Sequence, residues 1–484
     1  MTKLIAVLLA SLVLVCSCAQ SVDDGTSGKN SADANDTTQA AETEKPLETV
    51  DLDGFELRIL NYDKTWFTWA NTDMDAEELN GEILNDALFN RTLKTEQNFN
   101  AKVNFEYVKS THDVIGPLVF AGDDVYDMAM LFDAAIDDAI ASGWLGFWDE
   151  LGTINFEDKH WDADVVKLYN FNGRQVALDG AFSLYNYSTR HCYAFNKRML
   201  TDLNVGYNPY DLVNDGGWTL DKLYEIASAA VRDTDGDGNI TVKDTFGISG
   251  TVTRHYSALL AGSGVRYVDK DAEGMLYFTV ARDEYAVSVI QKLVELNVGN
   301  HIYSSGTNDI GGGDETLFRN GHTLFTAAYI NEVSALRDMD DDIGILPPPK
   351  FTEDQKRYYS LVEGGALSVI LKTLNPERYE NVGILLNALA YYSRQDVIPA
   401  YIEVLLKSKV SRDEESASMI ELIFDSSFYD LGTGVWSSII KNNYTSKIFL
   451  PRSTNVASVT ASIESQATAA IDEFMEAVNE QTAS

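Results

Sequence analysis

Cysteine and histidine are both scarce in this sequence. Three cysteines are present among 484 residues, at positions 16, 18 and 192, so only Cys192 lies beyond the N-terminal region. A folded part with a single cysteine holds no internal disulfide and must be stabilised by its hydrophobic cores. We expect Cys192 to be a small buried residue, and we assign no role to any of the six histidines.

Basic residues are far fewer than acidic residues. The 37 lysines and arginines face 74 acidic residues, which gives a formal net charge of −37. Such a surface repels nucleic acid and anionic lipid headgroups, so neither is expected as a partner. The same excess suits an exported domain that stays in solution, and we expect a monomer.

Several enzyme signatures are also missing. The chain contains no H-E-x-x-H zinc motif, no G-x-S-x-G nucleophile elbow and no phosphate-binding P-loop. Pairs of carboxylates could act on glycosidic bonds, but among 74 acids such pairs arise by chance. The sequence therefore favours a binding protein over an enzyme.

Only one long apolar run is present, from residue 4 to residue 15, and it follows Lys3. A helix needs about 20 apolar residues to span a bilayer, so this run is too short and has the length of a signal-peptide core. We expect residues 1–17 to be a signal peptide. The mature protein is then anchored to a membrane rather than threaded through it.

The end of this run, Val15-Cys16-Ser17-Cys18, resembles the lipobox of bacterial lipoproteins. In a lipobox a small residue precedes the cysteine that is lipidated, so Cys18 after Ser17 fits better than Cys16 after the bulky Val15. We expect a lipid on Cys18 and a location on the extracytoplasmic face of the cell membrane. The alternative is an ordinary secretory signal with incidental cysteines.

Residues 18–50 contain no aromatic side chain and are rich in Ser, Thr, Asp, Ala and Glu. A stretch of this composition cannot bury enough apolar surface to offset its ordering entropy, so we expect a flexible tether. Roughly 430 residues remain, which is too many for one hydrophobic core and predicts two or more lobes.

Strand and helix patterns alternate at the start of the folded part. Strands are expected over residues 55–62, 101–108 and 126–131, and helices over 82–99, 111–121 and 133–142, the second interrupted by Gly116-Pro117. This order implies an α/β fold with parallel βαβ units. Later elements are expected as helices over 218–232, with Thr219 as N-cap, and over 459–480, and as strands over 322–328 and 343–346.

Four longer stretches of the sequence together resemble those of a known family. They are NGEILNDALFNRTLKTEQNFNAKV, GGWTLDKLYEIA with the acidic glycine loop after it, FRNGHTLFTAAYI with IGILPPPK, and DLGTGVW. In this order they resemble the extracellular solute-binding proteins of carbohydrate ABC importers, the larger group that includes the maltose-binding protein. The resemblance implies a type II periplasmic-binding-protein fold, in which two α/β lobes joined by crossing strands close like a hinge on a ligand.

By analogy with that family, the chain is expected to cross between lobes near residues 184–193, 358–366 and 430. Lobe I would comprise residues 51–187 and about 358–430, and lobe II about 188–357 and about 431–484. Ligands of open α/β sheets bind outside the carboxyl ends of the strands, so the ligand is expected in the cleft between the lobes.

Sugars offer apolar C–H faces that aromatic rings cover and hydroxyl groups that carboxylates and amides bind. Trp436 lies in GTGVW, which resembles the place where the maltose-binding protein stacks a tryptophan on sugar. Each tryptophan could instead be core, and Asp133 could be a helix cap. Trp144, Trp148 and Trp161 are assigned to packing. The expected ligand residues are Trp66, Trp69, Asp133, Tyr329, Asn331, Glu363 and Trp436.

Residues 233–244 (DTDGDGNITVKD) match the spacing of an EF-hand calcium loop. Three aspartates take the first, third and fifth positions, and Gly238 takes the sharp turn. The twelfth position is aspartate instead of the usual glutamate, which shortens its reach. We expect a structural Ca²⁺ here, and the alternative is an unmetallated turn. The ligand set would be Asp233, Asp235, Asp237, the carbonyl of Asn239, and Asp244.

Together these features predict an extracytoplasmic substrate-binding lipoprotein that captures a sugar or oligosaccharide and delivers it to the permease subunits of an ABC transporter. Two alternatives stay open. One is a secreted carbohydrate-active enzyme, which turnover of a glycan would reveal. The other is a surface glycan-binding lipoprotein without a dedicated importer, which would lack neighbouring permease genes.

Overall fold

The computed structural model describes residues 46–67, 70–298, 301–304, 314–407 and 414–483. The chain divides into two compact units, residues 1–46 and 47–484, and the architecture below belongs to the second. The expected signal peptide, Cys18 and most of the tether lie outside the described residues. Leu47, at the end of the expected tether, packs against a hydrophobic core. Among the described helices, none has the length and apolarity that crossing a membrane requires.

The first sheet has four strands in the order β14-β3-β1-β2. β1 (Phe55–Tyr62) pairs in parallel with β2 (Ala101–Val108) and β3 (Met128–Phe132), whereas β14 (Ala366–Ile370) runs antiparallel to β3. The parallel pairing confirms the predicted βαβ units. Helices that pack on this layer are α1 (Ile83–Phe99), α2 (Thr111–Ala121), α3 (Ile136–Ala141) and α13 (Tyr379–Tyr392).

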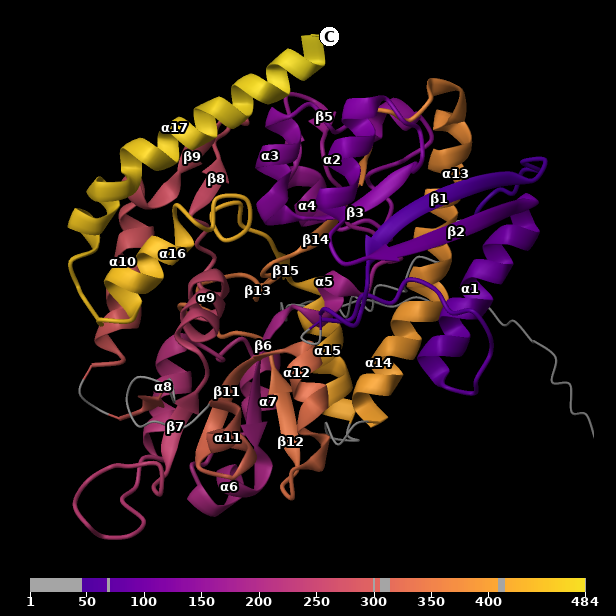
Figure 1. Ribbon diagram of the computed structural model, residues 1–484. Coiled ribbons are helices and arrows are strands. Elements are labelled where there is room, and N and C mark those ends of the chain that lie inside the picture. The colour runs from indigo at the N-terminus through magenta and orange to yellow at the C-terminus, as the bar shows by residue number, and fades with distance from the viewer. Residues whose placement is uncertain (1–45, 68–69, 299–300, 305–313, 408–413, 484) are drawn as a thin grey trace, which may run out of the picture. The chain divides into compact units, whose positions relative to one another are not determined.

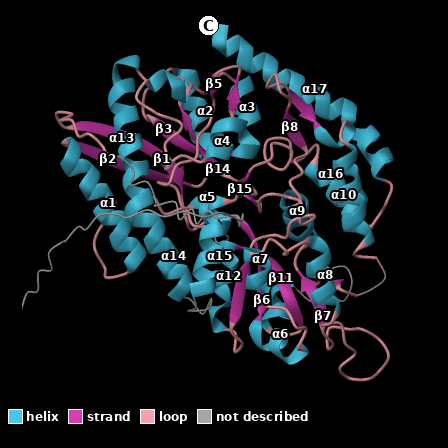
Figure 2. Ribbon diagram, turned by 180° about the vertical axis from the view of Figure 1, so that it is seen from behind, coloured by secondary structure: helices cyan, strands magenta, loops and turns pink. Residues whose placement is uncertain are grey.

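The second sheet has five strands in the order β10-β7-β11-β6-β12. Figures 1 and 2 show the two sheets as separate sets of strands, each with its own helices. β7 is parallel to β10 and β11, while β6 is antiparallel to both β11 and β12. The strands are β6 (His191–Asn196), β7 (Phe246–Ser249), β10 (Tyr303–Ser304), β11 (Thr323–Tyr329) and β12 (Ile343–Leu346). The helices around them are α6 (Lys197–Leu203), α7 (Pro209–Asn214), α8 (Leu220–Ser228), α9 (Val252–Gly262), α11 (Asp314–Arg319), α12 (Ile330–Ser334) and α15 (Glu414–Asp425).

Two described segments connect the two sheets, and a third segment lies beside them. The first passes through α5 (Tyr185–Ser188) into β6, and the second passes from β12 through β13 (Ser360–Leu361) into β14. The third follows α15 and contains β15 (Ser427–Phe428), which pairs in parallel with β13. Arg190 bridges to Val362, so the first segment joins the other two. We call these paired segments the hinge ribbon.

A long helix also extends from one core to the other. α13 continues through a π-helical turn, Ser393–Val397, into α14 (Ile398–Lys407). Tyr391 in α13 belongs to the core under β1 and β3, whereas Tyr401 in α14 belongs to a core that includes residues of β6 and β12. We call this continuous element the bridging helix.

The C-terminal tail is helical, as predicted, over α17 (Val456–Ala483), drawn in yellow in Figure 1. It packs against α3 and also against β9 (Leu276–Phe278) and α10 (Glu284–Glu295). α15 packs against β12 of the second sheet. The exact lobe boundaries stay predictions.

The expected interruption of α2 at Gly116-Pro117 was wrong, because the helix is continuous over Thr111–Ala121. A Cβ at Gly116 would lie 2.6 Å from atoms of the Trp144 ring, so glycine is present for close packing and not for a break. Thr219 caps α8 as predicted, accepting from the Lys222 amide at 3.3 Å. The interior positions of Trp148, Trp161 and Cys192 were also predicted correctly.

Candidate functional site

Five polar side chains meet where the two sheets face the hinge ribbon. Asp133 follows β3, and Glu363 precedes β14, in the first sheet; His191 begins β6, and Tyr329 ends β11, in the second. Lys441, in α16 (Lys441–Tyr444), completes the group, which we call the cleft cluster. Three of the five, Asp133, Tyr329 and Glu363, are among the expected ligand residues, and the structure brings them together.

Glu363 lies at the centre of the cleft cluster and is only 6 % exposed. Lys441 Nζ donates to its Oε1 at 2.8 Å, His191 Nε2 lies 2.9 Å from its Oε2, and the Tyr329 hydroxyl donates to Oε2 at 3.3 Å. Glu363 thus contacts side chains from the second sheet and from α16. Its three partners come from segments that are far apart in the sequence.

The protonation states of Glu363 and His191 follow from their burial and from the charges beside them. Burial alone would raise the pKa of Glu363, but the Lys441 ammonium and the hydrogen bond from His191 outweigh it and hold the pKa well below its usual range. Burial lowers the pKa of His191, although Glu363 opposes this effect. A neutral His191 therefore donates its Nε2 proton to an ionised Glu363, and its Nδ1 has no described hydrogen-bond partner.

Asp133 is buried beside Glu363 and is 4 % exposed. Its Oδ1 accepts from the Ala134 amide at 2.7 Å, and its Oδ2 accepts from the Gly365 amide at 3.2 Å. Burial raises the pKa of Asp133 to about 7, against the opposing effects of these amides and of Lys441. Near neutral pH this carboxyl can therefore act as a hydrogen-bond donor or as an acceptor.

Gly434 lies against Asp133 from the other side. A Cβ at Gly434 would be 2.4 Å from Asp133 Oδ2, which is closer than any side chain tolerates. Glycine at position 434 therefore allows this loop to approach the carboxyl group of Asp133, whereas Gly432 packs against Tyr267.

A cavity of about 240 Å³ adjoins the cluster on the side of the second sheet. Its lining includes Gly250, Arg254 and Glu332, and Arg254 pairs with Glu332 at 2.5 Å. The Arg254 guanidinium also lies 4.3 Å from the centre of the Tyr329 ring. The expected ligand residue Asn331 is half-buried in α12 and directly precedes Glu332 in the sequence.

The aromatic loop after β1 contributes an exposed ring and a packed one. Trp66 is 51 % exposed, and Lys109 Nζ lies 3.6 Å from the centre of its ring. Phe67 packs edge-on against Tyr62 and against Phe132, the residue before Asp133. Trp69 lies outside the described residues. Trp66 is thus partly exposed with the Lys109 ammonium over its ring, and Phe67 connects its loop to the cleft cluster.

The structure does not bring Trp436 to the cleft cluster. Its ring is 1 % exposed and packs edge-on against Phe474 of α17, with 5.6 Å between ring centres. A ring in this position fills the core, and it is Gly434, two residues earlier, that contacts Asp133. A role for Trp436 in binding a ligand stays a prediction.

Sequence reasoning missed three charged or titratable members of the site: His191, Arg254 and Lys441. His191 was one of six scattered histidines, and nothing in its neighbourhood distinguished it. Lys441 lies 78 residues from Glu363, so no local pattern indicated that the two side chains pair. The only signal in the sequence concerned His191, which lies within a predicted crossing between the lobes and begins β6.

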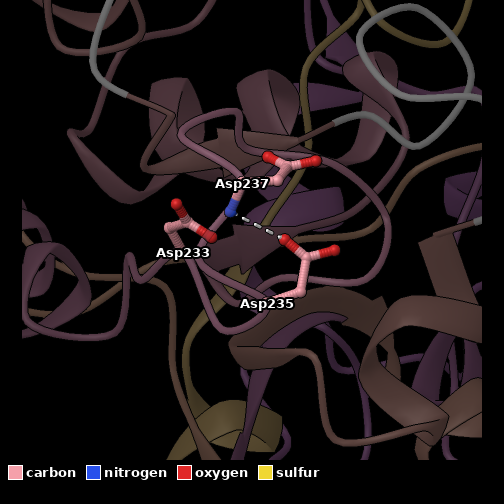
Figure 3. Close-up of side chains that lie close together, drawn as sticks. All are labelled: Asp233, Asp235 and Asp237. Carbon is pink, nitrogen blue, oxygen red and sulfur yellow. Dashed lines mark hydrogen bonds between the residues drawn. The ribbon is translucent and has the colours of Figure 1, made fainter.

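The predicted calcium loop connects α8 to β7 and is exposed (Figure 3). Carboxylate oxygens of Asp233, Asp235 and Asp237 lie within 4.8 Å of one another. Asp233 Oδ2 accepts from the amide of Gly238, the sharp-turn residue, at 2.8 Å. These three carboxylates fit the hard oxygen donors that Ca²⁺ prefers.

Asp244 serves the same loop in another way. Its Oδ1 accepts from the Thr234 amide and its Oδ2 from the Thr241 amide, both at 2.7 Å. These backbone hydrogen bonds lower the pKa of Asp244 to about 2. Both of its oxygens are engaged inside the loop, so the expected fifth ligand acts in this structure as an internal brace.

The fold of this chain is similar to the folds of several solved structures. UspC of M. tuberculosis matches 86 % of this chain and 100 % of its own, at 14 % identity and a TM-score of 0.55. The cyclic alpha-maltosyl-1,6-maltose binding protein of Arthrobacter globiformis matches 88 % and 99 %, at 13 % identity and a TM-score of 0.53. An ABC substrate-binding protein of Listeria monocytogenes in complex with cycloalternan matches 89 % and 100 %, at 13 % identity and 0.51.

No protein-family model matches the sequence, and the search of curated proteins finds no match. At 13–14 % identity the structural likeness establishes the fold. The chain has the two-lobe α/β fold of periplasmic solute-binding proteins, as the sequence predicted.

Proposed function

We propose that this chain is an extracytoplasmic solute-binding lipoprotein that captures a sugar or oligosaccharide between its lobes and delivers it to an ABC permease. The likeness of its fold to sugar-binding proteins supports this function, and the cleft cluster is the observation that carries it. Carboxylates, a hydroxyl and an imidazole gathered between two sheets are the groups that bind sugar hydroxyls.

The two-lobe arrangement explains how this protein could bind a ligand without catalysing a reaction. Asp133 follows β3 and Glu363 precedes β14, two strands of the first sheet, whereas His191 and Tyr329 lie in strands of the second. A ligand that bridges the two sets gains all of its contacts only when the lobes are closed. Such a ligand shifts an open–closed equilibrium by its different affinity for the two states. A permease could then recognise the closed conformation.

We assign the contacts as follows. The Trp66 ring would cover an apolar face of a sugar, while Asp133, Tyr329, Asn331 and Glu363 would bind hydroxyl groups. Lys441 would keep Glu363 ionised and in place. The balance of charge in the cluster, with Lys441 neutralising Glu363, favours a neutral glycan over a charged one.

The test is a thermal-shift screen with mono- and oligosaccharides, followed by titration calorimetry of the best hit. Binding raises the melting temperature by mass action. We expect Glu363→Gln to weaken this hit at least tenfold. Absence of any hit, or a hit indifferent to Glu363→Gln, would contradict the proposal. Chromatography of the sugar after incubation distinguishes a binding protein, which returns it intact, from a carbohydrate-active enzyme.

The membrane anchor belongs to the same proposal. A lipid on Cys18 and a tether up to about residue 50 would hold the folded body at the extracytoplasmic face, within reach of a permease. Metabolic labelling with radioactive palmitate is expected to mark the wild-type protein and not Cys18→Ser. Label that persists in Cys18→Ser and disappears in Cys16→Ser would move the anchor to Cys16.

We also propose that Asp233, Asp235, Asp237 and the carbonyl of Asn239 hold a structural Ca²⁺. The three convergent carboxylates and the loop spacing support it. Because the loop is exposed, the ion would hold the loop between α8 and β7 rather than take part in binding sugar. Asp244 would support this loop through its amide hydrogen bonds.

A further inference from the structure

A second cavity, of about 550 Å³, lies on the hinge ribbon and shares no residue with the cleft cluster. Each of the three segments of the hinge ribbon contributes to its wall, and so does the π-helical turn of the bridging helix. We call it the hinge pocket. Its lining includes Trp161, Asp179, Arg190, Tyr359, Arg394 and Ser427.

The hinge pocket lies on the other face of the hinge ribbon. Neighbouring residues of an extended segment point to opposite sides. His191 contacts Glu363 in the cleft cluster, whereas Arg190, directly before it, pairs with Asp162 at 3.3 Å beside the hinge pocket. A molecule in the hinge pocket would therefore contact the connections without entering the cleft.

Two buried polar atoms of this wall lack hydrogen-bond partners among the described residues. Trp161 is 4 % exposed, and its indole Nε1 has no acceptor. Asp179 is 2 % exposed; its Oδ2 accepts from the Tyr429 hydroxyl at 2.9 Å, but its Oδ1 has no donor of normal geometry. Both atoms belong to residues that line the hinge pocket, and a polar occupant of the pocket would supply the partners that they lack.

Glycine at position 180 fixes the placement of the indole. Gly180 pairs with Trp161 through the backbone, and a Cβ there would lie 2.6 Å from the Trp161 ring. The ring also packs edge-on against Trp148 and Phe182. The indole is therefore held rigidly, which lowers the entropy lost when its N–H binds a ligand.

The charge of the hinge pocket is balanced, unlike that of the whole chain. Its lining holds six acidic residues and six lysines or arginines, whereas the chain has 74 acids and 37 bases. Two of the arginines, Arg190 and Arg266, are already paired with Asp162 and Asp164. The pocket lining therefore has a formal charge near zero, which favours neither an anion nor a cation as its occupant.

Aromatic rings line the same wall. Tyr187, Tyr359 and Phe424 add apolar faces to a surface otherwise made of charged and hydroxyl groups. Burial, together with the neighbouring Asp162, raises the pKa of Asp179 to about 7, so near neutral pH this carboxyl can donate or accept. Rigid rings beside groups that both donate and accept match the two kinds of surface on a sugar ring or polyol.

We propose that the hinge pocket is a second binding site, separate from the cleft, for a small neutral polyhydroxylated molecule such as a single sugar ring or a cyclitol. The Trp161 indole N–H donates to one of its hydroxyl groups, and Asp179 binds another. Arg394 closes the pocket from the bridging helix. Since all three segments of the hinge ribbon line the site, its occupant contacts the parts of the chain that a change in lobe orientation must move.

The test is titration calorimetry of the purified protein with D-glucose, D-galactose and myo-inositol as probes. We expect at least one probe to give saturable heat, with affinity at least tenfold lower in both Trp161→Phe and Arg394→Ala. The binding component that Trp161→Phe and Arg394→Ala weaken should keep its affinity within twofold in Glu363→Gln, which alters only binding in the cleft, and in Arg282→Ala, which removes an exposed arginine elsewhere. Unliganded melting temperatures establish that each variant is folded.

Three results would overturn the proposal. The first is no saturable heat from any of the three probes. The second is heat that Glu363→Gln abolishes and that Trp161→Phe and Arg394→Ala preserve, which would put the probe in the cleft. The third is binding of inorganic phosphate, run in parallel, in place of the neutral probes. Failure of the cleft itself is recognised separately, by oligosaccharide binding that is absent or indifferent to Glu363→Gln.

Discussion

Lys441 Nζ lies 2.8 Å from Glu363 Oε1, and the side chains of the pair are 16 % and 5 % exposed. Two charges that have left water are stable only together, because each compensates the desolvation of the other. The pair joins the end of the hinge ribbon to α16. Its stability therefore bears on the whole cleft cluster.

Removing the cation alone is expected to be costly. Lys441→Met leaves Glu363 ionised and buried without its partner, so we expect the free energy of unfolding to fall by about 3 kcal/mol. Urea denaturation measures this loss. The double variant Glu363→Gln, Lys441→Met removes both charges and should recover much of the stability. Equal stability of Lys441→Met and the wild type would show that the pair is not a coupled buried pair.

Asp133 gives the fold a dependence on pH. Its pKa is raised to about 7 in the fold, whereas an exposed aspartate titrates near about 3.9. The folded state therefore binds a proton more tightly, which stabilises the fold fully below about pH 4 and is lost as the pH rises through about 7. Urea midpoints between pH 5 and pH 8 should fall less steeply in Asp133→Asn than in the wild type. Parallel curves would contradict the raised pKa.

Trp66 offers a test of binding without a large effect on the fold. Its ring is half exposed, so Trp66→Ala should leave the melting temperature almost unchanged while weakening the best sugar about tenfold, through loss of ring contacts. The matched control is Phe120→Ala, since Phe120 is 95 % exposed on α2 and away from the expected ligand residues. Equal losses in both variants would indicate a general surface effect.

Gly434 tests how closely the loop must approach Asp133. The Cβ of Gly434→Ala would meet Asp133 at 2.4 Å, so the loop or the carboxyl must shift. We expect a lower melting temperature and weaker sugar binding. Gly217→Ala is the control, because its Cβ meets nothing closer than 3.5 Å. A Gly434→Ala protein that matches Gly217→Ala in both measurements would separate this loop from the site.

The calcium loop predicts a response to metal. Removing Ca²⁺ with a chelator should lower the melting temperature, and Asp233→Ala should lose the response because it removes a ligand and the brace to Gly238. Glu464→Ala, which removes an exposed acid from α17, should respond like the wild type. An unchanged melting temperature on chelation of calcium-loaded wild type would leave the loop as an unmetallated turn.

Local pattern predicted much of this fold. Strand composition placed β1 at its observed bounds, and alternating apolar residues placed β2. The period of two is clear at the start of β2, where buried and exposed residues alternate, whereas β1 is buried on both faces. The interruption of α2 was wrong since glycine next to proline usually ends a helix, and only the distant Trp144 ring explains Gly116. Tertiary packing of this kind leaves no local trace in a sequence.

The candidate site was predictable where it follows strand ends. Asp133 was found because ligands of open α/β sheets bind at the carboxyl ends of strands. Tyr329 was found because its stretch resembles a ligand-binding region of the solute-binding family. Lys441 and Arg254 were missed because their partners, Glu363 and Glu332, are 78 residues away in each case. A pair of buried charges is created by the fold, and neither partner differs in the sequence from a solvated surface charge.

The bridging helix bears on how far the lobes can separate. It is one uninterrupted rod whose two ends are embedded in different cores, so the lobes cannot swing apart as if joined only by strands. The π-helical turn at Ser393–Val397 carries one extra residue per turn and is the softest point of such a rod. We therefore expect a change in lobe orientation to bend the helix at this turn, and substitutions there to change how readily the helix bends.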